Sequence, residues 1–325
     1  MMEVYRLENS KVIVEFLDLG GCITKIVKKE NGTNYVLSYY DSYQYKTNPY
    51  FLGATIGRLA GRTYPSRYYD YKRRKIELIP NEGRVHLHGG KDGFHLKSWV
   101  VSRTDRFEYT LSYSDKYSKH EKMDFQLIYK LENNNFFIIY KGKSDHPTVC
   151  NLTNHTYFNL NFDKSSSIEN HLLKIDSSKI QLIDEESIPT GYYDEITSLK
   201  KNSGFNFSTF KKIKLGFELG TELSEFCSNG VDLAYVFEKD DNINVPRIHL
   251  ISDNKENELK IYTNQESCVV YTLNKVFCPS IINDGNTIKK YGGITFEMQR
   301  KPNFINEDPE YLRKDYHSFI KYEIL

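Results

Sequence analysis

Short runs of alternating hydrophobic and polar residues recur along most of the chain. Residues 107–113 show the pattern clearly, because apolar or aromatic side chains occupy every second position, as in a strand with one buried face. Few windows carry apolar residues at helical spacing over ten or more residues, so the pattern predicts many strands and little helix. Further strands are predicted at 11–17, 22–27, 35–37, 125–129, 136–140, 259–263, 268–273, 294–299 and 319–324.

Turn residues separate these runs at short intervals. Asn31-Gly32 is a strong hairpin signal, and the polar segment 132–135 joins two aromatic runs as a second hairpin. The least regular region is 184–230, where we expect long loops with a short helix. Many short strands joined by close turns predict an all-β fold, a large antiparallel β-sandwich. Because no internal repeat or linker is evident, we interpret residues 1–325 as a single domain.

The charge balance and the cysteines narrow the class of protein. Lys and Arg number 44 against 43 Asp and Glu, so no net field favours nucleic acid or an anionic membrane, and we expect neither as a partner. No stretch approaches the roughly 20 apolar residues of a membrane span, and residues 1–6 lack a signal-peptide core. The five cysteines are scattered, odd in number and without a Cys-x-x-Cys pair, which is typical of reduced thiols, so we expect a cytoplasmic protein.

A histidine among asparagines is the first candidate for chemistry. His155 lies in Asn151-Leu152-Thr153-Asn154-His155-Thr156-Tyr157-Phe158-Asn159-Leu160, a segment that is otherwise aromatic and aliphatic. It is either a satisfied core residue, which the segment alone favours, or a proton donor in a polar pocket. As a donor it is expected to keep a pKa near the ordinary value, with Thr153 and Asn154 orienting the ring.

A carboxylate late in the chain is the second candidate. In 294–299, period two places Glu297 and Gln299 on one face with Thr295, and the apolar residues on the other. This placement is compatible with a general base, although the pattern alone favours a solvated strand face.

Three further segments carry candidate binding residues. Arg62 ends Gly57-Arg58-Leu59-Ala60-Gly61-Arg62, and its planar fork of donors suits paired oxygen atoms, with a surface ion pair as the alternative. His88 precedes Gly89-Gly90, which allow a tight turn. His86 and His88 would face the same way on a strand, as in a cupin metal site, but the glutamate that a cupin needs is missing from 89–94. Asp232, in 229–233, taken alone resembles a turn residue.

Taken together, these segments, in this order and at these separations, resemble the aldose 1-epimerase (galactose mutarotase) family from about residue 10 to about 324. The resemblance implies a twisted, galactose mutarotase-like supersandwich with its site on the concave face. It also implies that Glu297 is the catalytic base and His155 the acid, and that Arg62, His88 and Asp232 bind substrate.

The implied reaction interconverts the α and β anomers of free hexoses such as galactose or glucose. A base takes the proton of the anomeric hydroxyl, an acid protonates the ring oxygen, and the opened sugar rotates and recloses. This chemistry needs no metal, nucleotide or redox cofactor, so we expect none, with a small monosaccharide as the partner and a monomer or homodimer as the assembly.

Departures from the family pattern leave other functions open. The chain has Gly61 where the family often has Asn, Leu233 where it often has His or Asn, and Val269 at a position where some relatives have Gln. A phosphorylated sugar would need cations near the cleft, for which Arg58, Arg84 and Lys91 are available. A sugar-binding module without turnover is a third hypothesis, and a glycosidase that pairs Asp232 with Glu297 is a fourth.

Overall fold

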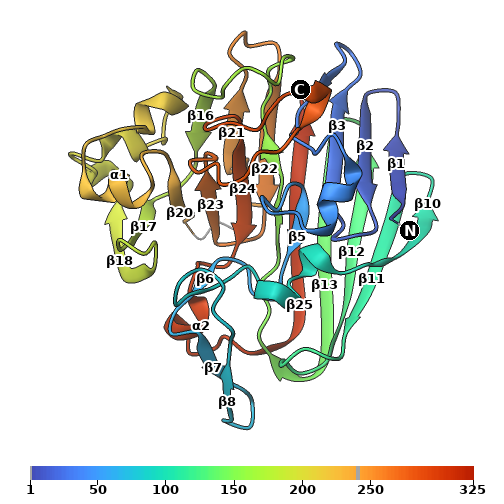
Figure 1. Cartoon of the computed structure of the whole chain (residues 1–325), viewed down its shortest axis with the longest axis vertical. Coiled ribbons are helices and arrows are strands. Elements are labelled where there is room, and N and C mark those ends of the chain that lie inside the picture. The colour runs from blue at the N-terminus through green and yellow to red at the C-terminus, as the bar shows by residue number, and fades with distance from the viewer. Residues whose placement is uncertain (1, 239–241) are drawn as a thin grey trace.

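Antiparallel sheets dominate the fold. The structure is a computed structural model and describes residues 2–238 and 242–325 (Figure 1). Its two largest sheets have nine and six strands, and every pairing within them is antiparallel. The predicted all-β, antiparallel sandwich is therefore confirmed.

The nine-stranded sheet forms one layer of the molecule. Two long strands lie at its centre. One of them is the C-terminal strand, which pairs on one side with strands from the first half of the sequence and on the other side with strands from the second half. In sheet order the strands are β10 (Val100–Asp105), β11 (Glu108–Asp115), β12 (Met123–Glu132), β13 (Asn135–Thr148), β25 (Arg313–Ile324), β22 (Glu258–Thr263), β21 (Ile248–Ile251), β16 (Leu172–Ile175) and β19 (Lys211–Lys212).

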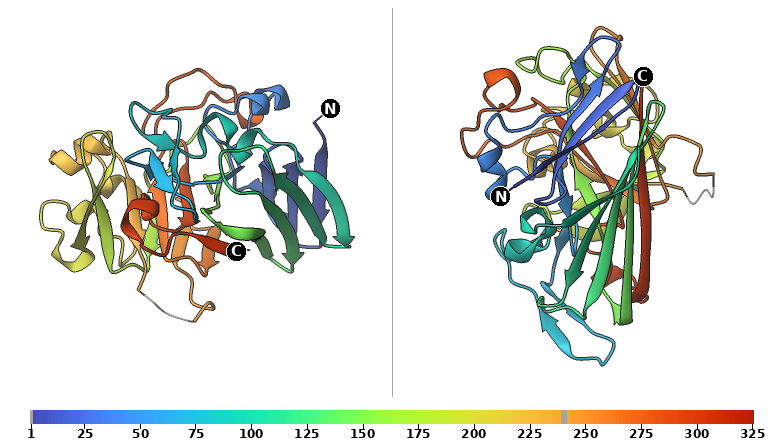
Figure 2. Two further views of the ribbon diagram at one scale, coloured as in Figure 1. Left: turned by 90° about the horizontal axis from the view of Figure 1, so that it is seen from below. Right: turned by 90° about the vertical axis from the view of Figure 1, so that its right-hand side faces the viewer.

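Two other sheets pack against this layer. Figure 2 shows the N-terminal strands lying over the green strands β11–β13, where Phe16 packs edge-on against Tyr129. The N-terminal sheet contains β1 (Val4–Glu8), β2 (Val12–Leu17), β3 (Ile23–Lys28) and β4 (Thr33–Asn34). The six-stranded sheet contains, in order, β15 (Tyr157–Phe158), β24 (Ile294–Gln299), β23 (Ser267–Tyr271), β20 (Asp232–Val236), β17 (Lys179–Ile183) and β18 (Pro189–Glu195).

Short elements complete the fold, and several carry loops over the six-stranded sheet (Figure 1). They pair as β5 (Ala54–Ile56) with β14 (Thr153–His155), β6 (Arg62–Thr63) with β9 (His86–Leu87), and β7 (Arg67–Tyr69) with β8 (Lys75–Glu77). The α-helices are α1 (Glu222–Phe226) and α2 (Phe304–Glu307), and 3-10 helices lie at Ser42–Lys46, Gly90–Asp92, Phe94–Leu96, Ile196–Ser198, Ser203–Phe205, Ile213–Gly216 and Asn283–Gly285. In the part of the chain described, no helix has the length and apolar character to cross a membrane.

The main core lies between the large sheets, and β24 shows how the sequence builds it. Ile294, Phe296 and Met298 point into this core, as the alternation at 294–299 predicted. The opposite face of β24 is also buried, since Glu297 is only 2% exposed and Gln299 is 0% exposed. The expectation of a solvated polar face is therefore wrong, because loops from elsewhere in the chain cover it.

Most predicted strands lie within one to three residues of observed ones, but β13 extends eight residues beyond the predicted 136–140 and β25 begins six residues before the predicted 319–324. Two other expectations are wrong. Residues 35–37 do not form a strand, since β4 ends at Asn34 and Val36 makes only an isolated bridge with Phe158. The 184–230 region does hold a short helix, α1, but it also holds β18 and β19. β18 escaped prediction because it is a largely exposed edge strand without apolar alternation. All five cysteines are free thiols, as expected.

Candidate active site

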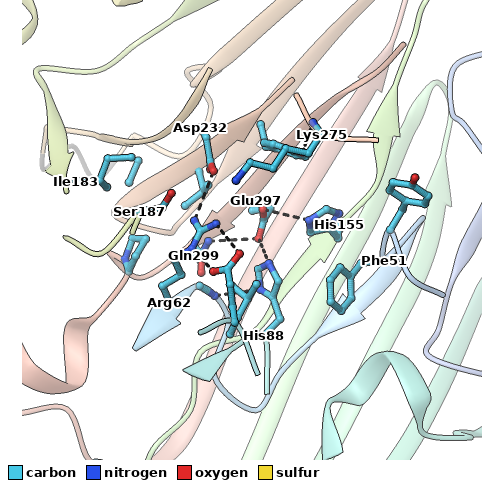
Figure 3. A pocket seen from close by; sticks show the side chains of 18 of the residues that line it. Phe51, Arg62, His88, His155, Ile183, Ser187, Asp232, Lys275, Glu297 and Gln299 are labelled. Carbon is cyan, nitrogen blue, oxygen red and sulfur yellow. Dashed lines mark hydrogen bonds and ion pairs between the residues drawn. The ribbon is translucent and has the colours of Figure 1, made fainter. Parts of the chain in front are cut away.

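A pocket of about 320 Å³ lies over the face of the six-stranded sheet opposite the main core (Figure 3). Side chains from β20, β23 and β24 form its floor, and loops that carry aromatic and imidazole rings form its walls. All five residues predicted for the site line this one pocket: Arg62, His88, His155, Asp232 and Glu297.

Sheet register explains why distant carboxylates meet on the floor. Glu297 pairs with Val269 on the neighbouring strand, and Asp232 pairs with Tyr271. Residues paired across an antiparallel sheet share a face, and so do residues two apart on one strand. Val269 and Tyr271 therefore bring Glu297 and Asp232 to the same face, although 65 positions separate them in the sequence.

Glu297 lies between two imidazoles. Its Oε1 is 3.4 Å from Nε2 of His155, and its Oε2 is 4.0 Å from Nε2 of His88. Gln299 Nε2 donates to the same Oε2 at 3.5 Å. Burial raises the pKa of Glu297 to about 8, with the charge of Asp232 adding to the rise and that of Arg62 opposing it. A carboxyl with such a pKa can both accept and return a proton near neutral pH.

Aromatic and imidazole rings surround His155 in the pocket. The ring centroids of Phe51, Tyr157 and His88 lie 5.5, 5.1 and 5.4 Å from that of His155. Within the described residues its Nδ1 has no hydrogen-bond partner, so the expectation that Thr153 and Asn154 orient it is wrong. Burial lowers the pKa of His155 to about 3, which also corrects the expected ordinary value. The residue is therefore a neutral imidazole.

The tautomer of His88 follows from one backbone contact. The amide N–H of Gly61 donates to His88 Nδ1 at 3.2 Å, so the proton of the neutral ring sits on Nε2, the atom that faces Glu297. Burial holds the pKa of His88 well below its usual range, and the neighbouring positive charge of Arg62 acts in the same direction. His88 is thus a neutral N–H donor directed at the carboxylate.

The same tautomer bears on metal binding. One ligand atom each from His88, His155 and Glu297 lie within 4.8 Å of one another, close enough to surround an ion. A metal at His88 Nε2 would require loss of the proton there and of the Gly61 hydrogen bond, because a metal ligand must be deprotonated. The donor set therefore fits proton transfer better than metal coordination.

His86 takes no part in the pocket, which corrects the interpretation of a paired His86 and His88. The strand β9 ends at Leu87, and His88 has a left-handed φ of 54°, which turns the chain. His86 Nδ1 instead contacts the carbonyl of Ile79 at 2.8 Å.

Arg62 and Asp232 form the polar side of the pocket. Arg62 Nη1 lies 3.5 Å from Asp232 Oδ2, while Nε and Nη2 contact the two oxygens of Glu82 at 2.6 and 3.2 Å. Burial raises the pKa of Asp232, and Arg62 opposes the rise. The turn-residue and surface-ion-pair alternatives do not describe this arrangement, since both side chains line the pocket.

Other motif residues are structural. The three asparagines of 151–160 fasten the segment to backbone carbonyls: Asn151 to Ala60, Asn154 to Gly53, and Asn159 to Ser166 and Gly292. Arg58 is 2% exposed and pairs with Asp115 at 3.1 Å. These contacts position the site residues without entering the pocket.

The cations proposed for a phosphorylated substrate are not gathered at the pocket. Arg58, Arg84 and Lys91 are absent from its lining, where the cations among the described residues are Arg62 and Lys275. Arg84 instead pairs with Glu186 and lies over the ring of Tyr64.

Sequence reasoning missed several lining residues. Glu82, Lys275, Phe51 and Tyr271 all line the pocket. No motif marks Glu82, since it lies in a turn before a glycine, and its contact with Arg62 depends on the loop that carries it. Phe51 has a left-handed φ of 57°, which only the structure reveals.

The fold and the pocket together define a β-sandwich protein whose pocket holds a buried carboxyl between two imidazoles. A family model described as aldose 1-epimerase matches residues 3–310. Galactose mutarotase from Sus scrofa is 29% identical over 315 residues, which cover 94% of this chain and 87% of that protein. Aldose 1-epimerase from Haemophilus influenzae is 29% identical over 272 residues, 82% of this chain and 76% of that protein.

Solved structures share the fold across the whole chain. An aldose epimerase homologue from C. elegans superimposes with a TM-score of 0.88 at 21% identity, covering 100% of this chain and 99% of that one. Galactose 1-epimerase from Lactobacillus acidophilus gives a TM-score of 0.83 at 24% identity, covering 100% and 98%. With the family model matched over most of its length, this chain belongs to the aldose 1-epimerase family.

Proposed function

We propose that this protein is an aldose 1-epimerase that interconverts the α and β anomers of free hexoses such as galactose or glucose. The observation that carries the proposal is the placement of Glu297, a buried carboxyl between two imidazole Nε2 atoms, on the floor of a pocket with Arg62 and Asp232 on its polar side. The names of the relatives point to the same reaction.

In the proposed mechanism, Glu297 is the base and His155 the acid. Glu297 takes the proton of the anomeric hydroxyl while His155 Nε2–H donates to the ring oxygen, so the C–O bond opens to the aldehyde. Rotation about the adjacent C–C bond and the reverse transfers close the ring as the other anomer. A neutral imidazole can act as such a donor, and a low pKa keeps it neutral. Because both groups regain their protonation states after reclosure, no co-reactant is needed.

Substrate recognition is assigned to the remaining polar groups. Arg62 offers donors and Asp232 offers acceptors 3.5 Å apart, a pairing that suits adjacent hydroxyls of one sugar ring. His88 Nε2–H faces the reacting centre and is assigned, with Arg62 and Asp232, to binding of the sugar hydroxyls. The scheme uses one domain, residues 1–325, and no metal or cofactor.

Polarimetry tests the proposal. Freshly dissolved α-D-galactose and α-D-glucose are followed with the wild-type protein and with Glu297→Gln. We expect wild type alone to accelerate mutarotation. No acceleration of either sugar by a folded wild-type protein would refute the proposal, and sugar binding without turnover would indicate the binding-module alternative.

A further inference from the structure

Arg62 is clamped between two carboxylates that make unequal contacts with it. The two carboxylate oxygens of Glu82 accept from Nε and Nη2 of Arg62 at 2.6 and 3.2 Å. Asp232 contacts only Nη1, at 3.5 Å. Two parallel N–H···O contacts form the strong, geometrically defined arginine–carboxylate pair. The orientation of the fork is therefore set by Glu82 and not by Asp232.

We propose that Glu82 is a positioning residue, which holds the Arg62 fork so that the oxygens of Asp232 stay available to substrate hydroxyls. The inference rests on the proposed function, in which Arg62 and Asp232 bind the sugar. It assigns no chemical step to Glu82 itself.

Competition between the two carboxylates is the physical basis. If Glu82 lost its charge, Asp232 would be the carboxylate still paired with Arg62 among the described residues, and the fork could close on it with two hydrogen bonds. Asp232 is largely buried, so the attraction between the two groups is weakly screened. A closed Arg62–Asp232 pair would occupy the acceptors that we assign to the sugar, and substrate would have to break it.

The pKa of Asp232 fits this balance. Burial raises it most, Arg62 lowers it, and the charge of Glu82 raises it again. The contribution of Glu82 is the direct repulsion between two carboxylates that share Arg62 as a contact.

The expected kinetic signature is a binding effect. Glu82 does not contact the reacting groups Glu297 and His155, so kcat should stay within about twofold of wild type in Glu82→Gln. KM should rise by roughly tenfold, the effect of about one hydrogen bond to a charged group. Glu82 is partly exposed, with 39% of its side chain accessible, so the variant is expected to fold.

A double-mutant cycle with a matched control tests the inference. Mutarotation of galactose is measured for wild type, Glu82→Gln, Asp232→Asn and the double variant, with thermal unfolding as a check on folding. The control is Glu8→Gln, because Glu8 is 38% exposed and accepts from Arg6 Nε and Nη2 at 3.0 and 2.7 Å, far from the pocket on β1.

We expect the control to match wild type and the Glu82→Gln effect on KM to vanish in the Asp232→Asn background. An unchanged KM in Glu82→Gln, or the same increase in both backgrounds, would overturn the inference. Should wild type turn over no sugar at all, the proposed function fails first. A crystal structure of Glu82→Gln then decides separately, since a fork closed on Asp232 supports the positioning role and an unmoved Arg62 overturns it.

Discussion

Replacing Glu297 with glutamine should lower the activity of the protein and raise its stability relative to wild type as the pH rises. Glutamine keeps the shape and one acceptor oxygen but cannot take a proton. Positioned acid–base groups supply about 100- to 10,000-fold, so kcat should fall at least about 100-fold while sugar binding persists. The residue is 2% exposed, so the change also removes a buried ionisable group.

The stability effect depends on pH with a defined sign. Burial raises the pKa of Glu297 from 4.5 to about 8, which at 1.36 kcal/mol for each pKa unit corresponds to about 5 kcal/mol. Between these two pH values the folded state holds a proton that the unfolded chain has lost. The contribution of Glu297 to wild-type stability is therefore full below about pH 4.5 and is lost as the pH rises to about 8.

Urea denaturation of both proteins at pH 5, 6.5 and 8.5 measures this difference. We expect the stability of Glu297→Gln relative to wild type to increase with pH, by about 4 kcal/mol between pH 5 and pH 8.5. For wild type, kcat/KM should rise with pH toward about 8 as the base ionises. A stability difference that does not change with pH would refute the buried, protonated carboxyl, and retained activity in the folded variant would remove Glu297 as the base.

Three other predictions concern the acid, the metal and a structural arginine. His155→Ala should lower kcat by at least about tenfold; a rate equal to wild type would make His88 or water the donor. EDTA should leave the rate unchanged, because His88 Nε2 carries a proton; inactivation reversed by added metal would contradict this tautomer. Arg58→Ala should cost about 3–5 kcal/mol of unfolding free energy, since it leaves Asp115 buried without its partner, and the KM of the folded fraction should not change. A change in KM without loss of stability would instead place Arg58 in substrate binding.

The alternation at 294–299 illustrates how far local pattern reaches. It assigned Ile294, Phe296 and Met298 to the core correctly, because side-chain direction on a strand follows from period two alone. It gave the wrong environment for Glu297, because the loops that cover that face come from residues far away in the sequence. Likewise, the asparagines of 151–160 drew attention to the right segment, although they bind backbone carbonyls and not the imidazole.

The sequence by itself determined the antiparallel β class, most strand positions and, through family resemblance, the five residues that meet in the pocket. The strand class and the strand positions depend on residue type and short-range spacing, which the chain displays directly, whereas the five site residues were implied by the resemblance to a family. Only the tertiary structure decided the properties of the site: the pKa of Glu297, the neutral state of His155, the tautomer of His88 and the clamp of Glu82 on Arg62. Each of these depends on burial or on a contact between segments distant in the chain, and neither follows from the order of residues alone.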